Sequence, residues 1–245
     1  MDTLANAYEP DAIEGRWTTL NRGTLSGAQF FVAQEHGFTG WRKFVLHVRA
    51  MALAASSIAV FEAAVDCVVD GDAATPKNLL AKHPSLARQR STREHRSTLL
   101  HYVSANGVED FRQKTPANIV EIANLLLDAG AKVDAASDAY GGGCTALSLL
   151  ATSVHPERAG VQIALLQTLL DRGANLHLRS AGNNHSVVHG CIANGQPAAA
   201  KFLADLGAPL DLESAAALGR LDVLEKQFEK ATAKQIESAF LYACG

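Results

Sequence analysis

Three segments of the chain share one pattern of apolar and polar positions. Each has an apolar helix that ends in Gly-Ala and then a short alternating run, and they are Ile119–Val133, Val161–Leu176 and Ala198–Leu210. Leucine or phenylalanine recurs within each segment at the spacing of one helix face. Glycine after a helix adopts the left-handed backbone that ends it without steric cost. We therefore predict three helices that stop at Gly130, Gly173 and Gly207.

A second pattern precedes each of these helices. Thr98–His101 (TLLH) leads to Gly107, and Ser186–His189 (SVVH) leads to Gly195 at the same spacing. Thr145–Ser148 (TALS) holds this place before the middle helix, and Glu213 with Gly219 continues the spacing further on. A hydroxyl or small residue that caps an apolar helix, a glycine turn and a second helix make a unit that must pack on its neighbours.

These residues resemble the ankyrin repeat, in which T-P-L-H-x-A-x-x-G precedes a leucine-rich helix and a Gly-Ala element. The resemblance covers roughly Ala59 to the end of the chain. It implies an all-α solenoid of about five helix-turn-helix repeats, whose first helices and finger loops line a concave surface for a partner. It also implies that the histidine of the first helix bonds loop backbone.

The chain departs from the ankyrin spacing in three places. The distance from Gly107 to Gly130 predicts an insertion between the two helices of a repeat, and a second insertion follows Val154. Conversely, Gly207 and Gly219 are too close for a full finger loop, so we expect a tight connection there.

The N-terminal part predicts a separate helical segment. Ala28–Phe38, followed by Trp41, reads as two short helices broken at Gly37 and Gly40. It is similar to a segment found ahead of ankyrin repeats in some bacterial proteins, where it would cover the open end of the stack. We accordingly divide the chain into a cap over residues 1–58 and a stack over residues 59–245, in which we expect the last repeat to be incomplete.

Two further segments near this boundary carry predictions. The apolar run Ala50–Phe61 reads as buried helix, too short to span a membrane. Phe61–Cys67, Gly71 and a helix that starts near Thr75-Pro76 read as a degenerate first repeat, because proline suits the first helical turn.

The composition argues against several classes of function but does not indicate any catalytic activity. The net charge of −3 gives no global reason to expect nucleic acid or an anionic membrane as partner. The four cysteines are too dispersed for a zinc cluster or a disulfide framework, which favours a reducing compartment. The N-terminus lacks the pattern of a secretory signal. We expect a cytoplasmic protein.

Candidate catalytic and metal motifs are weak. His185 and His189 have the i, i+4 spacing of a zinc helix, but we interpret His189 as the repeat histidine and predict no metal. Gly141–Gly143 lacks the lysine of a phosphate loop and reads as a finger tip. Asp66, Asp70 and Asp72 read as charges at a helix end. We expect no cofactor and no enzymatic activity, because no nucleophile arrangement stands out.

The basic run Arg88–Arg96 leaves three interpretations open. It is a solvated finger loop or one that pairs with acidic neighbours, a patch for an acidic protein surface, or a phosphate or nucleic-acid contact. Aromatic residues near it are too few for base stacking.

From the resemblance we expect the chain to be a module that binds another protein through its concave face and finger loops. Aromatic and arginine side chains give large, pre-ordered contacts. The candidate contact residues are Arg93, His95, Arg96, Tyr102, Asn106, Asp138, Tyr140, Asn183, Asn184 and His185.

Two alternatives remain. The insertions after Gly107 and Val154 could close over a small molecule or anion, with Arg112, Lys114 and His155 as polar groups. The chain could also be a purely structural section of a larger assembly.

Overall fold

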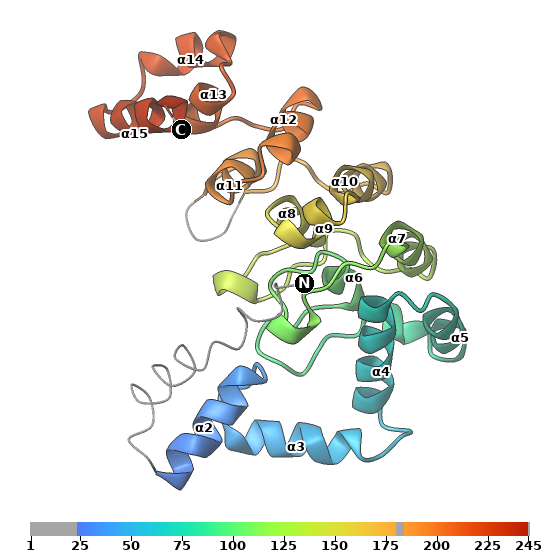
Figure 1. Cartoon of the computed structure of the whole chain (residues 1–245). Helices are drawn as coiled ribbons and strands as arrows, with labels where there is room; N and C mark the ends of the chain where they lie inside the picture. The colour runs from blue at the N-terminus through green and yellow to red at the C-terminus, as the bar shows by residue number, and fades with distance from the viewer. Residues whose placement is uncertain (1–23, 180–183, 245) are drawn as a thin grey trace.

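The computed structural model describes residues 24–179 and 184–244, and this part of the chain is all-α (Figure 1). It holds fourteen α-helices and three short 3-10 helices, with no strand beyond two isolated bridges. In chain order they are α2 (Leu25–Glu35), α3 (Trp41–Met51), α4 (Ser57–Asp70), α5 (Ala74–Lys82), η2 (Pro84–Arg88), α6 (Leu99–Tyr102), η3 (Asp110–Arg112), α7 (Ile119–Asp128), η4 (Ala139–Gly141), α8 (Ala146–Ala151), α9 (Val154–Arg158), α10 (Gln162–Asp171), α11 (Val187–Ala193), α12 (Pro197–Asp205), α13 (Leu212–Ala217), α14 (Leu221–Phe228) and α15 (Ala233–Cys244).

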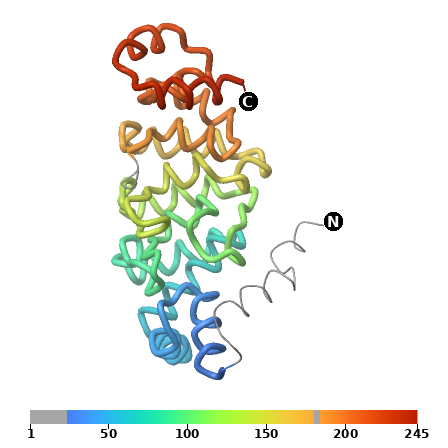
Figure 2. The backbone as a smooth tube through the Cα atoms, turned by 90° about the vertical axis from the view of Figure 1, so that its left-hand side faces the viewer, coloured from blue at the N-terminus to red at the C-terminus, as the bar shows by residue number. Residues whose placement is uncertain are grey.

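The helices lie in two layers along an elongated molecule (Figures 1 and 2). Helices α4, α6, α8, α11 and α13 contact one another in succession and form one layer. Helices α7, α10 and α12 contact one another in the same way and form the second. The apolar core runs between the layers, with residues such as Leu100, Ile122, Leu150 and Leu166 almost fully buried. No helix in the described residues is long and apolar enough to cross a bilayer.

The ends of the helices follow from the predicted signals. The N–H of Ser148 donates to Thr145 Oγ1 and the N–H of His189 donates to Ser186 Oγ, so both predicted caps begin a helix. Gly130, Gly173 and Gly207 have φ values between 87° and 90°, and each follows the end of a second-layer helix. The left-handed glycine lets the next N–H bond back into the helix, as Ala131 does to the carbonyl of Leu126 at 3.0 Å. The three predicted stops are confirmed.

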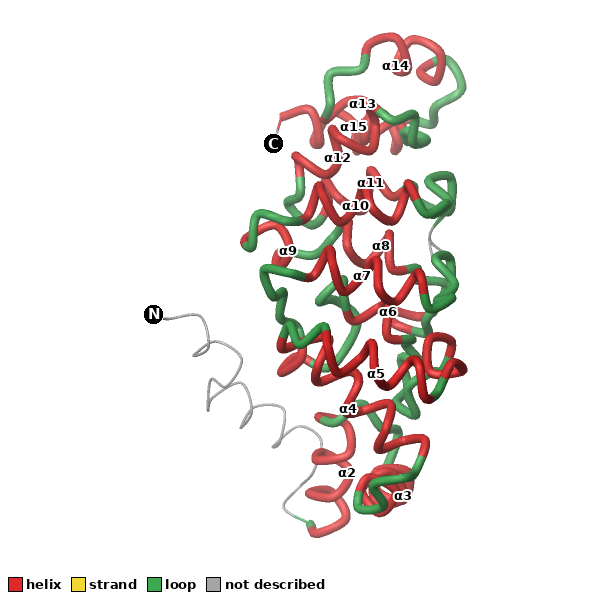
Figure 3. The backbone as a smooth tube through the Cα atoms, turned by 90° about the vertical axis from the view of Figure 1, so that its right-hand side faces the viewer, coloured by secondary structure: helices red, strands yellow, loops and turns green. Residues whose placement is uncertain are grey.

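The loops between the layers' helices gather along the long edges of the molecule (Figure 3). Two isolated antiparallel bridges lie in these loops, between Ser137 and Cys144 and between Arg179 and Ser186. Neighbouring loops also bond to each other, since the N–H of Asp138 donates to the carbonyl of His95 at 2.7 Å. After α12 the connection to α13 is short, as the glycine spacing predicts.

The N-terminal helices α2 and α3 are broken between Glu35 and Trp41, as predicted. Phe38 is almost fully buried between them and the loop before α6, where the Arg93 guanidinium lies 5.6 Å from its ring centroid. Trp41 is 38% exposed and packs on Phe44, so it covers the core less completely than expected.

The prediction of a buried helix over Ala50–Phe61 is wrong. Helix α3 ends at Met51, α4 starts at Ser57, and residues 52–55 between them are exposed, with Leu53 at 66%. Ser56 explains the break, because its hydroxyl donates to the carbonyl of Ala50 and accepts from the N–H of Ala59. A capping serine therefore starts a new helix inside the apolar run.

At the other end, α15 packs along α13 (Figure 1). Ala239 is buried in this contact, whereas Phe240 and Leu241 on the same helix are 67% and 65% exposed. The C-terminal helix thus covers the last helix of the first layer.

Gly107 carries a stability prediction, because it has a left-handed φ of 66° and no room for a side chain. A Cβ there would lie 2.9 Å from Ala139 Cβ and 3.0 Å from Leu149 Cδ2, which are both buried. Gly173→Ala is the matched control, since its φ is 87° but nothing lies within 4 Å of the new Cβ. Chemical denaturation should show a loss of about 1–2 kcal/mol for the control, from backbone strain alone. Gly107→Ala should lose at least about 1 kcal/mol more, from overpacking. Equal losses would contradict this account.

Candidate functional site

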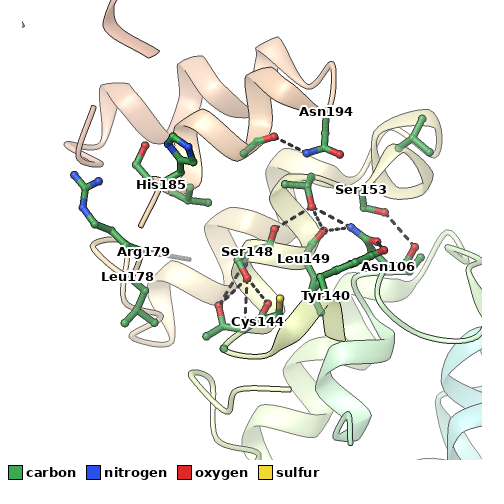
Figure 4. A pocket seen from close by; sticks show the side chains of 18 of the residues that line it. Asn106, Tyr140, Cys144, Ser148, Leu149, Ser153, Leu178, Arg179, His185 and Asn194 are labelled. Carbon is green, nitrogen blue, oxygen red and sulfur yellow. Dashed lines mark hydrogen bonds between the residues drawn. The ribbon is translucent and has the colours of Figure 1, made fainter. Parts of the chain in front are cut away.

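A groove of about 610 Å³ runs between the loops and the first-layer helices (Figure 4). Its walls are formed by the turn after α6, the loop around η4, helices α8, α9 and α11, and the loop before α11. The volume lies within the usual range for ligand sites. Its described polar lining includes Asn106, Gln113, Tyr140, Ser148, Thr152, His155, Arg179, His185 and Asn194.

Tyr140 is the most prominent side chain of the groove. It is 75% exposed, yet its hydroxyl donates to Asn106 Oδ1 at 2.7 Å. Its backbone has φ 52° and ψ 33°, a left-handed conformation that is strained for a residue with a bulky side chain. Such strain persists only where surrounding structure enforces it, and it concentrates at functional sites.

Asn106 holds the phenol because it is itself anchored. Its Nδ2 donates to the carbonyl of Leu149 at 3.1 Å and to Thr152 Oγ1 at 3.0 Å, at the C-terminal end of α8. These bonds turn Oδ1 toward Tyr140 (Figure 4). The ring is therefore both exposed and pre-ordered, which is what a contact residue needs to bind without a large entropy cost.

The structure brings three of the predicted contact residues, Asn106, Tyr140 and His185, into this one groove. Arg96 and Asp138 are exposed on adjacent loops and approach to 3.6 Å. Asn184 is exposed beside the groove, and its carbonyl accepts from Arg179 at 2.8 Å. Asn183 lies outside the described residues.

The predicted exposure of Arg93 and Tyr102 is wrong. Arg93 is 5% exposed and Tyr102 is fully buried. Arg93 Nη1 donates to Glu62 Oε1 at 2.5 Å, its Nε pairs with Glu109, and the Tyr102 hydroxyl points at the same Glu109 carboxylate at 3.5 Å. His95 is also largely enclosed, 3.6 Å from Glu109. Neither Arg93 nor Tyr102 can contact a partner from this position.

Arg112, which the alternative function places near a ligand, completes the same buried cluster. Its guanidinium donates to Glu62 Oε2 and to Asp66 Oδ1, each at 2.6 Å. We call Glu62, Arg93, Glu109 and Arg112 the buried charge cluster. The cluster joins α4, the loop before α6 and the insertion at η3, so the insertion is held against the rest of the fold.

The buried charge cluster is electrically balanced, with two guanidinium groups and two carboxylates. Burial alone would raise the pKa of Glu109, but His95, Arg93 and Arg112 together lower it to about 2. Facing carboxylates likewise raise the pKa of Arg112. Glu109 and Arg112 therefore stay ionised at neutral pH.

The other arginines of the basic run also have partners within the chain. Arg88 donates to the carbonyl of Gly130 at 2.9 Å, and Arg90 donates to the carbonyls of Arg96 and Ala136. These arginines therefore hold neighbouring loops together through hydrogen bonds. This agrees with the first of the three interpretations, in which the run is a loop that is solvated or pairs within the chain. The carboxylates around Gly71 also have structural roles, since Asp66 pairs with Arg112 and Asp72 accepts from the N–H groups of Ala74 and Thr75.

His101 and His189, which end the TLLH and SVVH segments, differ in their bonding. The N–H of Thr98 donates to His101 Nδ1 at 3.1 Å, so His101 Nε2 carries the proton and donates to the carbonyl of Cys144 at 3.2 Å. This is the bond to loop backbone that the ankyrin resemblance implies. Burial lowers the pKa of His101 to about 4.

His101 therefore carries a pH prediction. Because the pKa is lower in the folded state than the ordinary 6.5, the unfolded chain binds the proton more tightly between these values. Its contribution is fully present above pH 6.5 and is lost as the pH falls toward 4. The loss should approach about 3 kcal/mol. Denaturation across this window should show a shallower pH dependence for His101→Gln, and an unchanged slope would contradict the assignment.

His189 lacks the equivalent bond. Its ring donates to and accepts from no described residue, and its Nδ1 is buried without a partner. It stacks on His185 instead, with ring centroids 3.7 Å apart and planes within 6°. Burial and the neighbouring His185 lower the pKa of His189. The expectation that His189 bonds loop backbone is wrong for this histidine.

Asp211 is the residue of this region that sequence reasoning missed. It precedes α13, and its Oδ2 lies 3.9 Å from His185 Nδ1. Its carboxylate also accepts from the N–H of Ser186 and from Arg179, at 2.8 and 2.7 Å. In the sequence, Asp211 is distinguished only by its position just before a short helix. That position predicts a helix cap rather than a binding residue.

Comparison with protein-family models finds no match for this sequence. Comparison with curated proteins also finds none.

Proposed function

We propose that this chain is an ankyrin-type repeat protein that binds another protein in the groove around Tyr140. The observation that carries the proposal is Tyr140 itself, an exposed aromatic residue on a strained backbone whose hydroxyl is held by Asn106. Tyrosine is enriched among residues that dominate binding energy, because its ring gives large contact area at low entropy cost.

The arrangement of the helices supports the repeat assignment. A hydroxyl residue stands before each of α6, α8 and α11, and a glycine stop with the backward bond at Gly-Ala follows each of α7, α10 and α12. The first-layer helices contact one another in succession. The bond from His101 to the next loop is the one that the ankyrin resemblance implies. We also propose a cytoplasmic location, on the dispersed cysteines of the sequence.

The groove lining indicates what kind of segment it suits. Amides, hydroxyls, histidines and Arg179 line it, and its described lining residues include no carboxylate. A partner segment with backbone carbonyls or acidic side chains finds donors here, whereas a lysine-rich segment finds no counter-charge in the lining.

Affinity capture from cells of the source organism tests the proposal. Asn194→Trp places a large side chain on the groove wall, because Asn194 lines the groove and is exposed. Ala198→Trp on α12 is the control, since it is also exposed but does not line the groove. We expect a partner that is retained by the control and lost from Asn194→Trp. A partner retained equally by both would place binding elsewhere.

A small molecule or anion in the same groove is the second candidate. Its support is the volume of about 610 Å³ and the contribution of both insertions, through Gln113 and His155. Arg112 no longer supports it, because the buried charge cluster holds that side chain. A thermal-shift screen against metabolites separates the candidates, since a ligand that binds only the folded state raises its stability.

A further inference from the structure

Three side chains that can bind metal meet at the end of the groove nearest α13. His185 lies in the loop before α11, His189 lies on α11, and Asp211 is the residue just before α13. One donor atom from each lies within 4.8 Å of the other two. The three come from different elements, so the fold rather than local sequence brings them together.

The short connection after α12 explains why the His189 ring is available. His101 bonds the carbonyl of Cys144, the residue just before the cap of the next first-layer helix. The corresponding residue for His189 is Leu210, whose carbonyl instead accepts from Gln227 Nε2 at 3.0 Å. With no finger loop there, the ring faces His185 and Asp211, and its Nδ1 stays buried without a partner among the described residues.

The surroundings of Asp211 orient it. Arg179 holds Oδ1, and the N–H of Ser186 holds Oδ2 on the side that faces His185. Carboxylate ligands of metals commonly have such outer partners, which fix their orientation. Each carboxylate oxygen accepts more than one interaction, so these bonds leave Oδ2 able to bind an ion.

We propose that His185, His189 and Asp211 bind a divalent transition metal ion of the zinc class. Two imidazoles and one carboxylate are a donor set that such ions prefer, and a fourth position would stay open to water or to a partner's side chain. The ion would join the loop before α11 to the start of α13, at one end of the groove. The site goes beyond the proposed partner binding and does not depend on it.

Binding requires one local rearrangement. A metal lies in the plane of each imidazole that binds it, whereas the two rings are now parallel and stacked. One ring must turn out of the stack; His185 lies in a loop and is 36% exposed, whereas His189 lies on α11. The positive charge of Arg179 beside Asp211 opposes the ion, so we expect micromolar rather than tighter affinity.

Calorimetric titration of the full chain with Zn²⁺ tests the site. We expect one ion per chain and a loss of affinity of at least about tenfold in His185→Gln and in His189→Gln. His177→Gln is the matched control, because His177 is exposed and outside the cluster, and it should bind Zn²⁺ as the unchanged chain does. Absence of binding at micromolar Zn²⁺, or equal affinity in all three variants, would overturn the proposal.

Thiolates must be excluded as the ligands, since Cys244 is exposed and also binds zinc readily. Co²⁺ substituted for Zn²⁺ reports this directly. We expect a tetrahedral d–d absorption spectrum without the near-ultraviolet band of cobalt–thiolate bonds, both in the unchanged chain and in Cys244→Ser. A thiolate band that disappears in Cys244→Ser would assign the metal to the cysteine and overturn the proposal. Circular dichroism of each histidine variant distinguishes a lost ligand from a lost fold.

Discussion

Glu62→Gln should lower the free energy of unfolding by about 3–5 kcal/mol, the usual cost of breaking a buried ion pair. Glu62 is 1% exposed, and its two oxygens accept from Arg93 and Arg112 at 2.5 and 2.6 Å. The amide keeps the shape but leaves two buried guanidinium groups with a single buried carboxylate, Glu109. Urea denaturation followed by circular dichroism measures the effect.

Glu121→Gln is the matched control for this experiment. This substitution makes the same chemical change on the exposed surface of α7, where it should lower the free energy of unfolding by less than about 0.5 kcal/mol. If Glu62→Gln is no more destabilising than Glu121→Gln, the buried charge cluster does not hold the N-terminal helices and the η3 insertion together as we describe.

Tyr140→Ala should weaken binding of the captured partner by at least about 2 kcal/mol, or roughly 30-fold in Kd. The ring is exposed and already ordered, so its contact area is gained with little loss of entropy. Isothermal titration calorimetry with the purified partner measures the change. Phe240→Ala is the control, because Phe240 is 67% exposed on α15 and does not line the groove.

Substitution of Asn106 tests the same prediction through the hydrogen bond that orders Tyr140. Asn106→Ala frees the phenol without removing it, so it should weaken binding less than Tyr140→Ala does. The double variant should be no weaker than Tyr140→Ala alone, because the two residues act through one hydrogen bond. Strictly additive losses would show that Asn106 contacts the partner independently of Tyr140.

The sequence predicts the helices better than it predicts burial. Caps such as Thr145 and Ser186 and stops such as Gly130 depend on local chemistry, and the structure has them where predicted. Asn106 lies in the turn after α6 and Tyr140 lies in the loop before α8, and both line the groove.

Burial of charged residues depends on partners that are distant in sequence. From the sequence, Arg93 is predicted to be an exposed loop arginine, and Arg112 is predicted to lie in a ligand-binding insertion. In the structure, Arg93 instead pairs with Glu62 and Glu109, and Arg112 pairs with Glu62. Asp211 joins the two histidines only because a shortened connection places α13 beside α11. No spacing rule within one helix pair contains this information.

Hydrogen–deuterium exchange of the chain with and without its captured partner tests the groove most directly. We predict slower exchange on binding at the amides of residues 139–149 and 184–194, which form the walls around Tyr140 and His185. Protection confined to the second-layer helices α7 and α10, with exchange in the groove unchanged, would contradict the account.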